Sequence, residues 1–293
     1  MQNTQPQRLW IFGDSWSATS PTKDPDRIWT RQLAQRLSQT IGRPVQVRNH
    51  SLIGAAPDWI TEQYLKNTAS MGADDYVVMV LTSPYRVWYF EDIPSLTNWN
   101  IIDFDSIVSR EQAQAVELYL KHIQREHIDT LHMVNRLGNI AYESASRGLR
   151  RPMLIKGFDQ DLNIAESYPD ICIAKGYLSA VQYNEYADLD QMDQLKDRTP
   201  APNWFYGFDC RYNHLCLRNH DILVDKLLQG LLKDRAPDLT QGFHQHIIKE
   251  NWYEDSEFCQ QELHVSGIEN FFKVKEQTTS SWKDRTGLSK IFG

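Results

Sequence analysis

The run Tyr76–Leu81 is apolar without interruption, and it constrains the fold more than any other segment of the sequence. A strand with one exposed face alternates between apolar and polar residues, whereas a continuous apolar run is typical of a strand buried on both faces. Sheets that are covered on both faces are mostly parallel, with helices connecting the strands. Tyr76–Leu81 therefore predicts an internal strand of a parallel α/β sheet.

Predicted strands and predicted helices alternate along the chain on both sides of this strand. By their apolar content, further strands are predicted at Arg8–Phe12, Val45–Val47 and Met153–Ile155. By their 3.6-residue apolar spacing, helices are predicted at 28–41, from 59, at 109–148 and at 222–232. Strands that alternate with helices in this way favour a parallel sheet with helices packed on it.

The chain of 293 residues is 41% hydrophobic, which is enough to bury one large core. We therefore expect one main domain over residues 1–237. Beyond Pro237 the sequence becomes polar and aromatic by turns, and we treat residues 238–293 as a C-terminal extension. Because a disordered segment normally contains fewer aromatic residues, the extension is expected either to pack on the domain or to dock a protein partner or a second copy.

The charge and the hydropathy pattern exclude several classes of partner. The net charge of −7 opposes binding to nucleic acid phosphates or anionic lipids. The longest apolar run falls far short of the roughly 20 residues that a membrane-spanning helix needs. Residues 1–7 lack the basic and apolar stretches of a secretory signal, so we expect a cytoplasmic location or export by another route. The four cysteines have no paired spacing, and we interpret them as free thiols.

No metal or organic cofactor is expected. Three histidines, His122, His127 and His132, recur every five residues, a spacing that turns each about 140° from the last on a helix, so they cannot converge on one ion. His244 and His246 have no further ligand at a recognisable spacing. Neither a phosphate-binding P-loop nor a GxGxxG sequence follows the first strand, which disfavours nucleotide chemistry.

Chemistry-bearing residues follow the first strand and precede the last helix. Gly13, Asp14 and Ser15 lie where the first strand gives way to a loop, which is where open α/β sheets place reactive groups. A serine nucleophile needs a histidine base, which in turn needs an acceptor that fixes its tautomer. Asp209 and His214, just before the closing helix, can supply both. Taken separately, a Gly-Asp-Ser triplet is usually a turn, and an Asp with a nearby His is usually a capping or surface pair.

In this order along an α/β chain, these residues resemble the SGNH (GDSL) hydrolase superfamily over roughly residues 8–235. The second motif of that family, an Asn followed by a Gly, is matched by Asn49 and Gly54. The resemblance implies a three-layer α/β/α, flavodoxin-like domain with a parallel sheet of about five strands. It also implies Ser15 as nucleophile, His214 as base and Asp209 as its orienting group, with the amides of Ser15 and Gly54 receiving the oxyanion.

The third motif departs from the family pattern. Where the family has GxND, this chain has the sequence TSPYR at 82–86, and the asparagine donor of the oxyanion hole is missing. Either the hydroxyl of Thr82 or Ser83 substitutes for it, or Arg86 places a charged donor near the developing oxyanion. Arg86 is equally well explained as a structural ion-pair residue.

The last motif is also irregular, because four residues separate Asp209 from His214 where the family usually has two. His220 is a rival base, but helical spacing places it on the closing helix, so we expect it to be packed or exposed rather than catalytic.

The sequence thus predicts a serine esterase that works through an acyl-enzyme. The absence of a long apolar lid gives a slight preference for O-acetyl esters of carbohydrates among small-molecule ester substrates. The alternative, from a different class, is an SGNH scaffold that has lost catalysis along with GxND and acts as a structural or binding protein through its C-terminal extension.

Overall fold

The computed structural model describes residues 6–18, 28–52, 54–89, 109–158, 160, 162, 165–178, 215 and 217–243. Five strands form one sheet: β1 (Gln7–Phe12), β2 (Val45–Asn49), β3 (Tyr76–Leu81), β4 (Met153–Lys156) and β5 (Cys172–Tyr177). They pair in the order β2-β1-β3-β4-β5, and every pair is parallel. The predicted parallel sheet of about five strands is confirmed.

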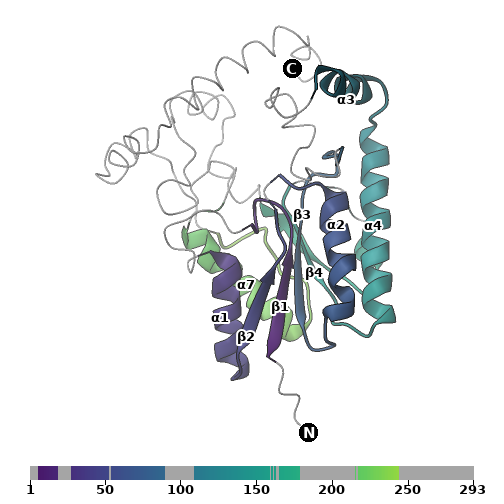
Figure 1. Ribbon diagram of the computed structural model, residues 1–293. Helices are drawn as coiled ribbons and strands as arrows, with labels where there is room; N and C mark the ends of the chain where they lie inside the picture. The colour runs from purple at the N-terminus through teal and green to yellow at the C-terminus, as the bar shows by residue number, and fades with distance from the viewer. Residues whose placement is uncertain are drawn as a thin grey trace, which may run out of the picture.

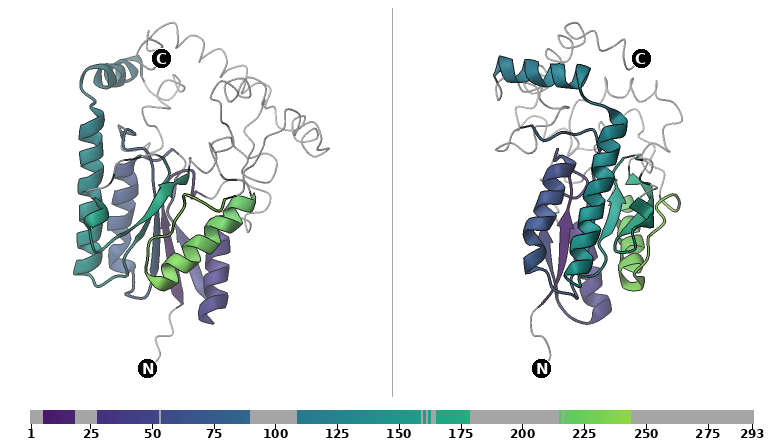
Figure 2. Two further views of the ribbon diagram at one scale, coloured as in Figure 1. Left: turned by 180° about the vertical axis from the view of Figure 1, so that it is seen from behind. Right: turned by 90° about the vertical axis from the view of Figure 1, so that its right-hand side faces the viewer.

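Helices cover both faces of the sheet. The two helices α1 (Trp29–Ile41) and α7 (Leu217–Lys233) pack together on one face, and α2 (Pro57–Asn67) and α4 (Glu126–Ser146) lie on the other (Figure 1). Another helix, α3 (Arg110–His122), lies crosswise at the start of α4 (Figure 2). Two short 3₁₀ turns, η2 (Thr68–Ser70) and η4 (Ala165–Ser167), complete the described elements. The predicted three-layer α/β/α fold is confirmed.

Burial follows the position of each strand in the sheet. All six residues of β3 are buried, as the apolar run predicts, because β3 lies between β1 and β4 and both of its faces are covered. The edge strand β2 instead alternates between half-buried and exposed residues. One core cluster joins the sheet to α1 and α7, and a second joins it to α2 and α4.

Two features of the fold differ from the sequence prediction. The strand β5 was not predicted, because its sequence CIAKGY contains Lys175 and Gly176 and has no clear alternation. The predicted helical stretch 109–148 is two helices, with a break between His122 and Glu126. At this break the Gln124 side chain donates to a carboxylate oxygen of Asp129 and to the carbonyl of Tyr85, which lies beyond β3.

The first residues of the predicted extension contact the sheet. The amide of Leu239 donates to the carbonyl of Lys175 in β5, and the Leu239 side chain is buried in the core cluster beneath α7. The domain boundary at residue 237 and the role of the extension stay predictions, because residues 244–293 lie outside the described part of the chain.

Within the described residues, no helix is both long enough and apolar enough to cross a bilayer. The same residues contain no group of three or more His, Cys, Asp or Glu side chains that could hold a metal ion. Cys172 is a buried free thiol, and burial raises its pKa. The other three cysteines lie outside the described ranges.

Gly230 shows how tightly α7 packs on the sheet. Although it lies inside the helix, a β-carbon at this position would come within 2.7 Å of the Met153 side chain and 2.9 Å of the Arg235 carbonyl oxygen. Gly138, inside α4, differs, because the nearest atoms to a β-carbon there would be the Tyr168 hydroxyl oxygen at 3.5 Å and two atoms of its ring at 3.7 Å, which are ordinary contacts.

This contrast gives a testable prediction. Alanine is favoured over glycine inside a helix by about 1 kcal/mol, so Gly138→Ala should raise the free energy of unfolding by up to that amount. Gly230→Ala should lower it instead, because overpacking against a fixed carbonyl costs roughly 1–3 kcal/mol. Urea unfolding of both variants measures the two changes. Equal stabilisation by both would show that the chain after α7 does not pack as described.

Candidate active site

Four loops leave the carboxyl ends of neighbouring strands at one edge of the sheet. Among the described residues, 13–18 follow β1, 50–52 and 54 follow β2, 82–86 follow β3, and 157, 158 and 160 follow β4. Because the strands are parallel, these loops lie at the same edge, where open α/β folds bind their ligands. The sequence-predicted residues Ser15, Gly54, Thr82, Ser83 and Arg86 all belong to these loops.

The loop after β1 forms one tight turn that holds Ser15. The Asp14 side chain is fully buried, and its Oδ1 accepts the Trp16 amide at 3.1 Å. The Asp14 carbonyl accepts the amides of Ser17 and Ala18 at 3.1 and 2.8 Å. Asp14 therefore caps this turn in the way that an N-cap residue caps a helix. Ser15 is half-buried, while its neighbours Asp14 and Trp16 are buried.

Gly13 allows this turn to lie close to the sheet. A β-carbon on Gly13 would lie 2.9 Å from the Val80 β-carbon and 3.1 Å from the Val80 carbonyl oxygen, and it would also overlap the Ser17 hydroxyl. Glycine is the residue that permits such a close approach of two backbones.

The loop after β2 is hydrogen-bonded to the turn after β1. The Asn49 side-chain amide donates to the Ser17 carbonyl at 2.7 Å, and its Oδ1 accepts the Ser51 amide at 3.0 Å. The Leu52 amide donates to the Gly13 carbonyl at 3.0 Å. Gly54 follows with φ at +78°, a left-handed conformation that favours glycine. The second family motif thus lies beside the first.

The loop after β3 brings Arg86 to the same turn. The Arg86 Nη1 donates to Asp14 Oδ2 at 3.0 Å, so Arg86 does form an ion pair, while its part in the chemistry stays a prediction. The guanidinium carbon lies 5.4 Å from the centroid of the Phe158 ring, which contacts the Trp16 ring edge-on with centroids 6.2 Å apart. The charge of Arg86 is therefore placed between the turn after β1 and the loop after β4.

The two hydroxyl candidates of this loop differ in access. Thr82 is completely enclosed, and its backbone carbonyl accepts the Gln160 side-chain amide at 2.7 Å. Ser83 is half-buried, and its hydroxyl oxygen accepts the Tyr85 amide at 3.4 Å. A hydroxyl that accepts one hydrogen bond still has its own proton to donate.

Buried polar atoms without a hydrogen-bond partner gather at this edge of the sheet. Within the described residues they include Ser51 Oγ, Thr82 Oγ1, Arg86 Nε and Gln160 Oε1, which come from the loops after three different strands. Because nearly all buried polar groups in native proteins are paired, such a group of atoms calls for an explanation, and binding or catalysis is one of the recognised ones.

The predicted base and its orienting group, His214 and Asp209, lie outside the described residues and stay predictions. The rival histidine, His220, lies in the first turns of α7 and is 5% exposed. Its Nδ1 accepts the Trp29 amide, at the start of α1, at 3.4 Å. Of the two positions expected for His220, packed or exposed, the structure shows the packed one, and its exclusion as the base stays a prediction.

Three residues that contact the site have no recognisable functional signal in the sequence. Asp14 was named only as part of the Gly-Asp-Ser triplet, and its burial beside Arg86 left no signal in the sequence. Phe158 and Gln160 follow β4 in no recognisable motif, and only the alignment of four strand ends brings them here.

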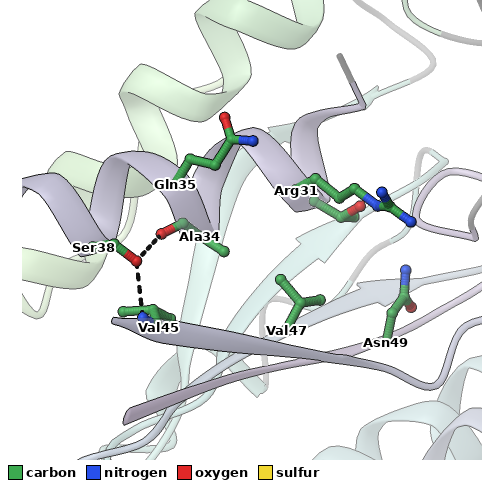
Figure 3. A pocket seen from close by; sticks show the side chains of 8 residues that line it. Arg31, Ala34, Gln35, Ser38, Val45, Val47 and Asn49 are labelled. Atoms are coloured by element: carbon green, nitrogen blue, oxygen red, sulfur yellow. Dashed lines mark hydrogen bonds between the residues drawn. The ribbon is translucent and has the colours of Figure 1, made fainter. Parts of the chain in front are cut away.

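A separate groove of about 460 Å³ runs between α1 and the edge strand β2 (Figure 3). It is lined by Thr30, Arg31, Ala34, Gln35, Ser38, Val45, Val47 and Asn49. At one end the Val45 amide donates to Ser38 Oγ, and at the other Asn49 adjoins the site. Because Ser15, Gly54 and Arg86 do not line it, this groove runs beside the candidate active site rather than forming it.

Comparison with known proteins gives no family and no curated protein that matches the sequence. Several solved structures are similar to the chain. TesA has 18% identity and a TM-score of 0.32, over 55% of this chain and 66% of its own. The psychrotrophic esterase EstA from Pseudoalteromonas sp. has 11% identity and a TM-score of 0.41, over 78% of this chain and 97% of its own.

A member of the lipolytic G-D-S-L family from Veillonella parvula has 11% identity and a TM-score of 0.40, over 78% of this chain and 99% of its own. The sequence motifs resemble this same family. Because the identities and TM-scores are low, the assignment of an activity depends on the residues of the site.

The hydrogen bond from the Asn49 side chain to the Ser17 carbonyl gives a prediction that does not depend on the function. Asn49→Asp keeps the oxygen that accepts the Ser51 amide, but it replaces the nitrogen that donates to the Ser17 carbonyl with an oxygen that cannot donate. We expect a loss of about 1–3 kcal/mol of unfolding free energy and faster hydrogen exchange at residues 14–18, because a carbonyl loses its donor. Asn67→Asp is the control, since it removes a similar bond, to the Gln63 carbonyl, at the end of α2. If hydrogen exchange at residues 14–18 were unchanged in Asn49→Asp, the hydrogen bond from Asn49 would not be what holds this turn.

Proposed function

We propose that this chain is a serine esterase in which Ser15 attacks the carbonyl carbon of a carboxylic ester. One observation carries the proposal: the turn capped by Asp14 holds a half-buried serine at the carboxyl edge of a parallel sheet. The Asn49–Gly54 loop is hydrogen-bonded to this turn, as a second wall of the site. The esterase and lipolytic proteins with similar structures have the same general fold.

The chemistry follows the order of a serine hydrolase. As the Ser15 oxygen bonds to the ester carbon, His214 accepts the Ser15 proton, and the carbonyl oxygen becomes an oxyanion. The bond to the alcohol oxygen then breaks, and His214 returns the proton to the leaving alcohol. Water attacks the acyl-enzyme by the same route, which releases the carboxylic acid and restores Ser15. Asp209 accepts a hydrogen bond from the second ring nitrogen of His214 and holds its orientation.

The oxyanion needs donors that are already in place, each worth about 2.7–4 kcal/mol of barrier. We assign this task to the backbone amides of Ser15 and Gly54. Of the three candidates for a further donor, Thr82 is fully enclosed and one Arg86 nitrogen is bound to Asp14. Ser83 is accessible and retains its hydroxyl proton, so it fits best as a direct donor.

The substrate class that we propose is a small acyl ester, with O-acetyl groups on carbohydrates preferred. This preference rests on the lack of a long apolar lid in the sequence, which a long acyl chain would need for burial. The cytoplasmic location expected from the sequence stays a prediction.

A second candidate function is a binding protein on a catalytically inactive scaffold. It is favoured by one observation: the third family motif lacks its asparagine, and the arginine in that loop is paired with Asp14. In this case the extension beyond residue 237 would contact a partner. Measured turnover separates the two candidates.

Replacement of the nucleophile tests the proposal directly. Ser15→Ala should abolish both the hydrolysis of p-nitrophenyl acetate and covalent labelling by a fluorophosphonate, with a rate loss on the order of 10⁶-fold. Ser146→Ala, at an exposed serine in the last turn of α4, is the matched control and should retain both. If the wild type neither turns over nor labels, the binding protein becomes the better explanation. A label on a peptide other than the one that contains Ser15 would disprove the nucleophile assignment.

Two histidine variants test the base. His214→Gln should lower turnover by at least about 10⁴-fold, because Ser15 loses its proton acceptor. His220→Gln should retain the turnover per folded molecule but lose about 1 kcal/mol of stability, since the Trp29 amide at the start of α1 loses its acceptor. Steady-state kinetics together with thermal unfolding distinguish them. The opposite pattern would make His220 the base.

A further inference from the structure

The Asp14–Arg86 ion pair is unusual in its burial and its place. Asp14 is 0% and Arg86 17% exposed, whereas the other described ion pairs mostly include a partner that is at least 36% exposed. A buried pair is weak evidence for stability, because desolvation of the two charges offsets their attraction. Stability alone therefore does not account for a buried pair directly beside Ser15.

The two oxygens of Asp14 have separate partners. Oδ1 accepts the Trp16 amide, and Oδ2 accepts the Arg86 Nη1, at 3.1 and 3.0 Å. Ser15 lies between Asp14 and Trp16 in the sequence, so the bond from the Trp16 amide to Asp14 Oδ1 spans the Ser15 backbone. Rotation of the carboxylate would break one bond or the other, so the bond from Arg86 helps to hold the carboxylate in the orientation that caps the turn.

Arg86 is itself held firmly enough to act as an anchor. Its amide donates to the Ser83 carbonyl at 3.2 Å, and the preceding residue, Tyr85, is bound through its carbonyl by the Gln124 side chain at 2.9 Å. The guanidinium lies over the Phe158 ring, which contacts Trp16. A site needs such supporting contacts, because small errors in position reduce its function strongly.

We infer that Arg86 is a positioning residue for Ser15: its ion pair with the Asp14 carboxylate fixes the turn that presents the nucleophile. Arg86 acts through Asp14 and need not touch the substrate. This inference rests on the proposed esterase function and adds a role that the third family motif, which lacks an arginine, does not supply. It also gives a reason for the arginine in a loop that has lost the asparagine of the family.

The experiment compares Arg86→Gln with Arg8→Gln in the full-length protein. Arg8, in β1, pairs with Asp75, which precedes β3, so this pair lies at the opposite ends of the two strands that Asp14 and Arg86 follow. The exposed fractions of 22% for Arg8 and 6% for Asp75 make it the best match in burial. Both variants remove the partner of a buried carboxylate, so both should unfold at lower temperature. The measurements are the rate constant of fluorophosphonate labelling per folded molecule and the hydrogen exchange of residues 14–18.

If Arg86 positions Ser15, Arg86→Gln should label roughly 100-fold more slowly, the effect of about 1 Å of misplacement, with little change in probe affinity. Its amides at residues 16–18 should exchange faster, and Arg8→Gln should match the wild type in both measurements. Wild-type labelling by Arg86→Gln, or an equal loss in Arg8→Gln, would overturn the inference.

If Arg86→Gln does not fold, Arg86→Lys keeps the charge but loses the planar fork of donors, and it should label more slowly than the wild type. A wild-type rate in Arg86→Lys would then overturn the inference. If the wild-type protein does not label at all, the esterase proposal fails, and the hydrogen exchange of residues 14–18 alone decides whether Arg86 fixes the turn.

Discussion

Parallel pairing of β1 with β3 is the interaction on which the candidate site depends. Leu9 is in register with Tyr76, and Phe12 is in register with Met79, so the two strands end side by side. The Gly13–Ala18 turn therefore emerges next to the loop that carries Arg86, although some 70 residues separate them in the sequence. The pairing of β2 with β1 adds the Asn49–Gly54 loop on the other side. A shift of this register would separate Asp14 from Arg86.

Polar contacts hold the candidate site at one edge of the sheet, next to the apolar core that covers both faces of the sheet. Asp14 accepts the amides of its own turn and the Arg86 guanidinium, while Asn49 and the Leu52 amide bind the same turn from the β2 side. Low dielectric surroundings strengthen such contacts and make an unpaired partner costly. A turn fixed from two sides is preorganised, and preorganisation is what a nucleophile and its oxyanion donors require.

Packing around the sheet also explains where sequence propensity fails. Gly230 lies within α7, where alanine would be the better helix former, because the chain after the helix folds back against it. β5 forms from the unremarkable sequence CIAKGY because β4 offers it a parallel partner. The helical stretch after residue 109 breaks at Gln124, whose side chain bonds the segment beyond β3. In each case a contact distant in sequence decides the local structure.

The sequence by itself determined the class of fold and predicted part of the candidate site. Apolar runs and helical spacing are local properties, so they located β1, β2, β3 and β4 and the helices α1, α2 and α7. The Gly-Asp-Ser triplet predicted Ser15 as the nucleophile, and the Asn49–Gly54 motif predicted a second loop of the site, which the structure places beside the first. Only the tertiary structure decided that Asp14 is buried against Arg86, that Phe158 and Gln160 reach the same edge, and that His220 is packed against α1. These contacts join residues from different strands and helices, and their geometry is set by sheet register and burial, which no short stretch of sequence contains.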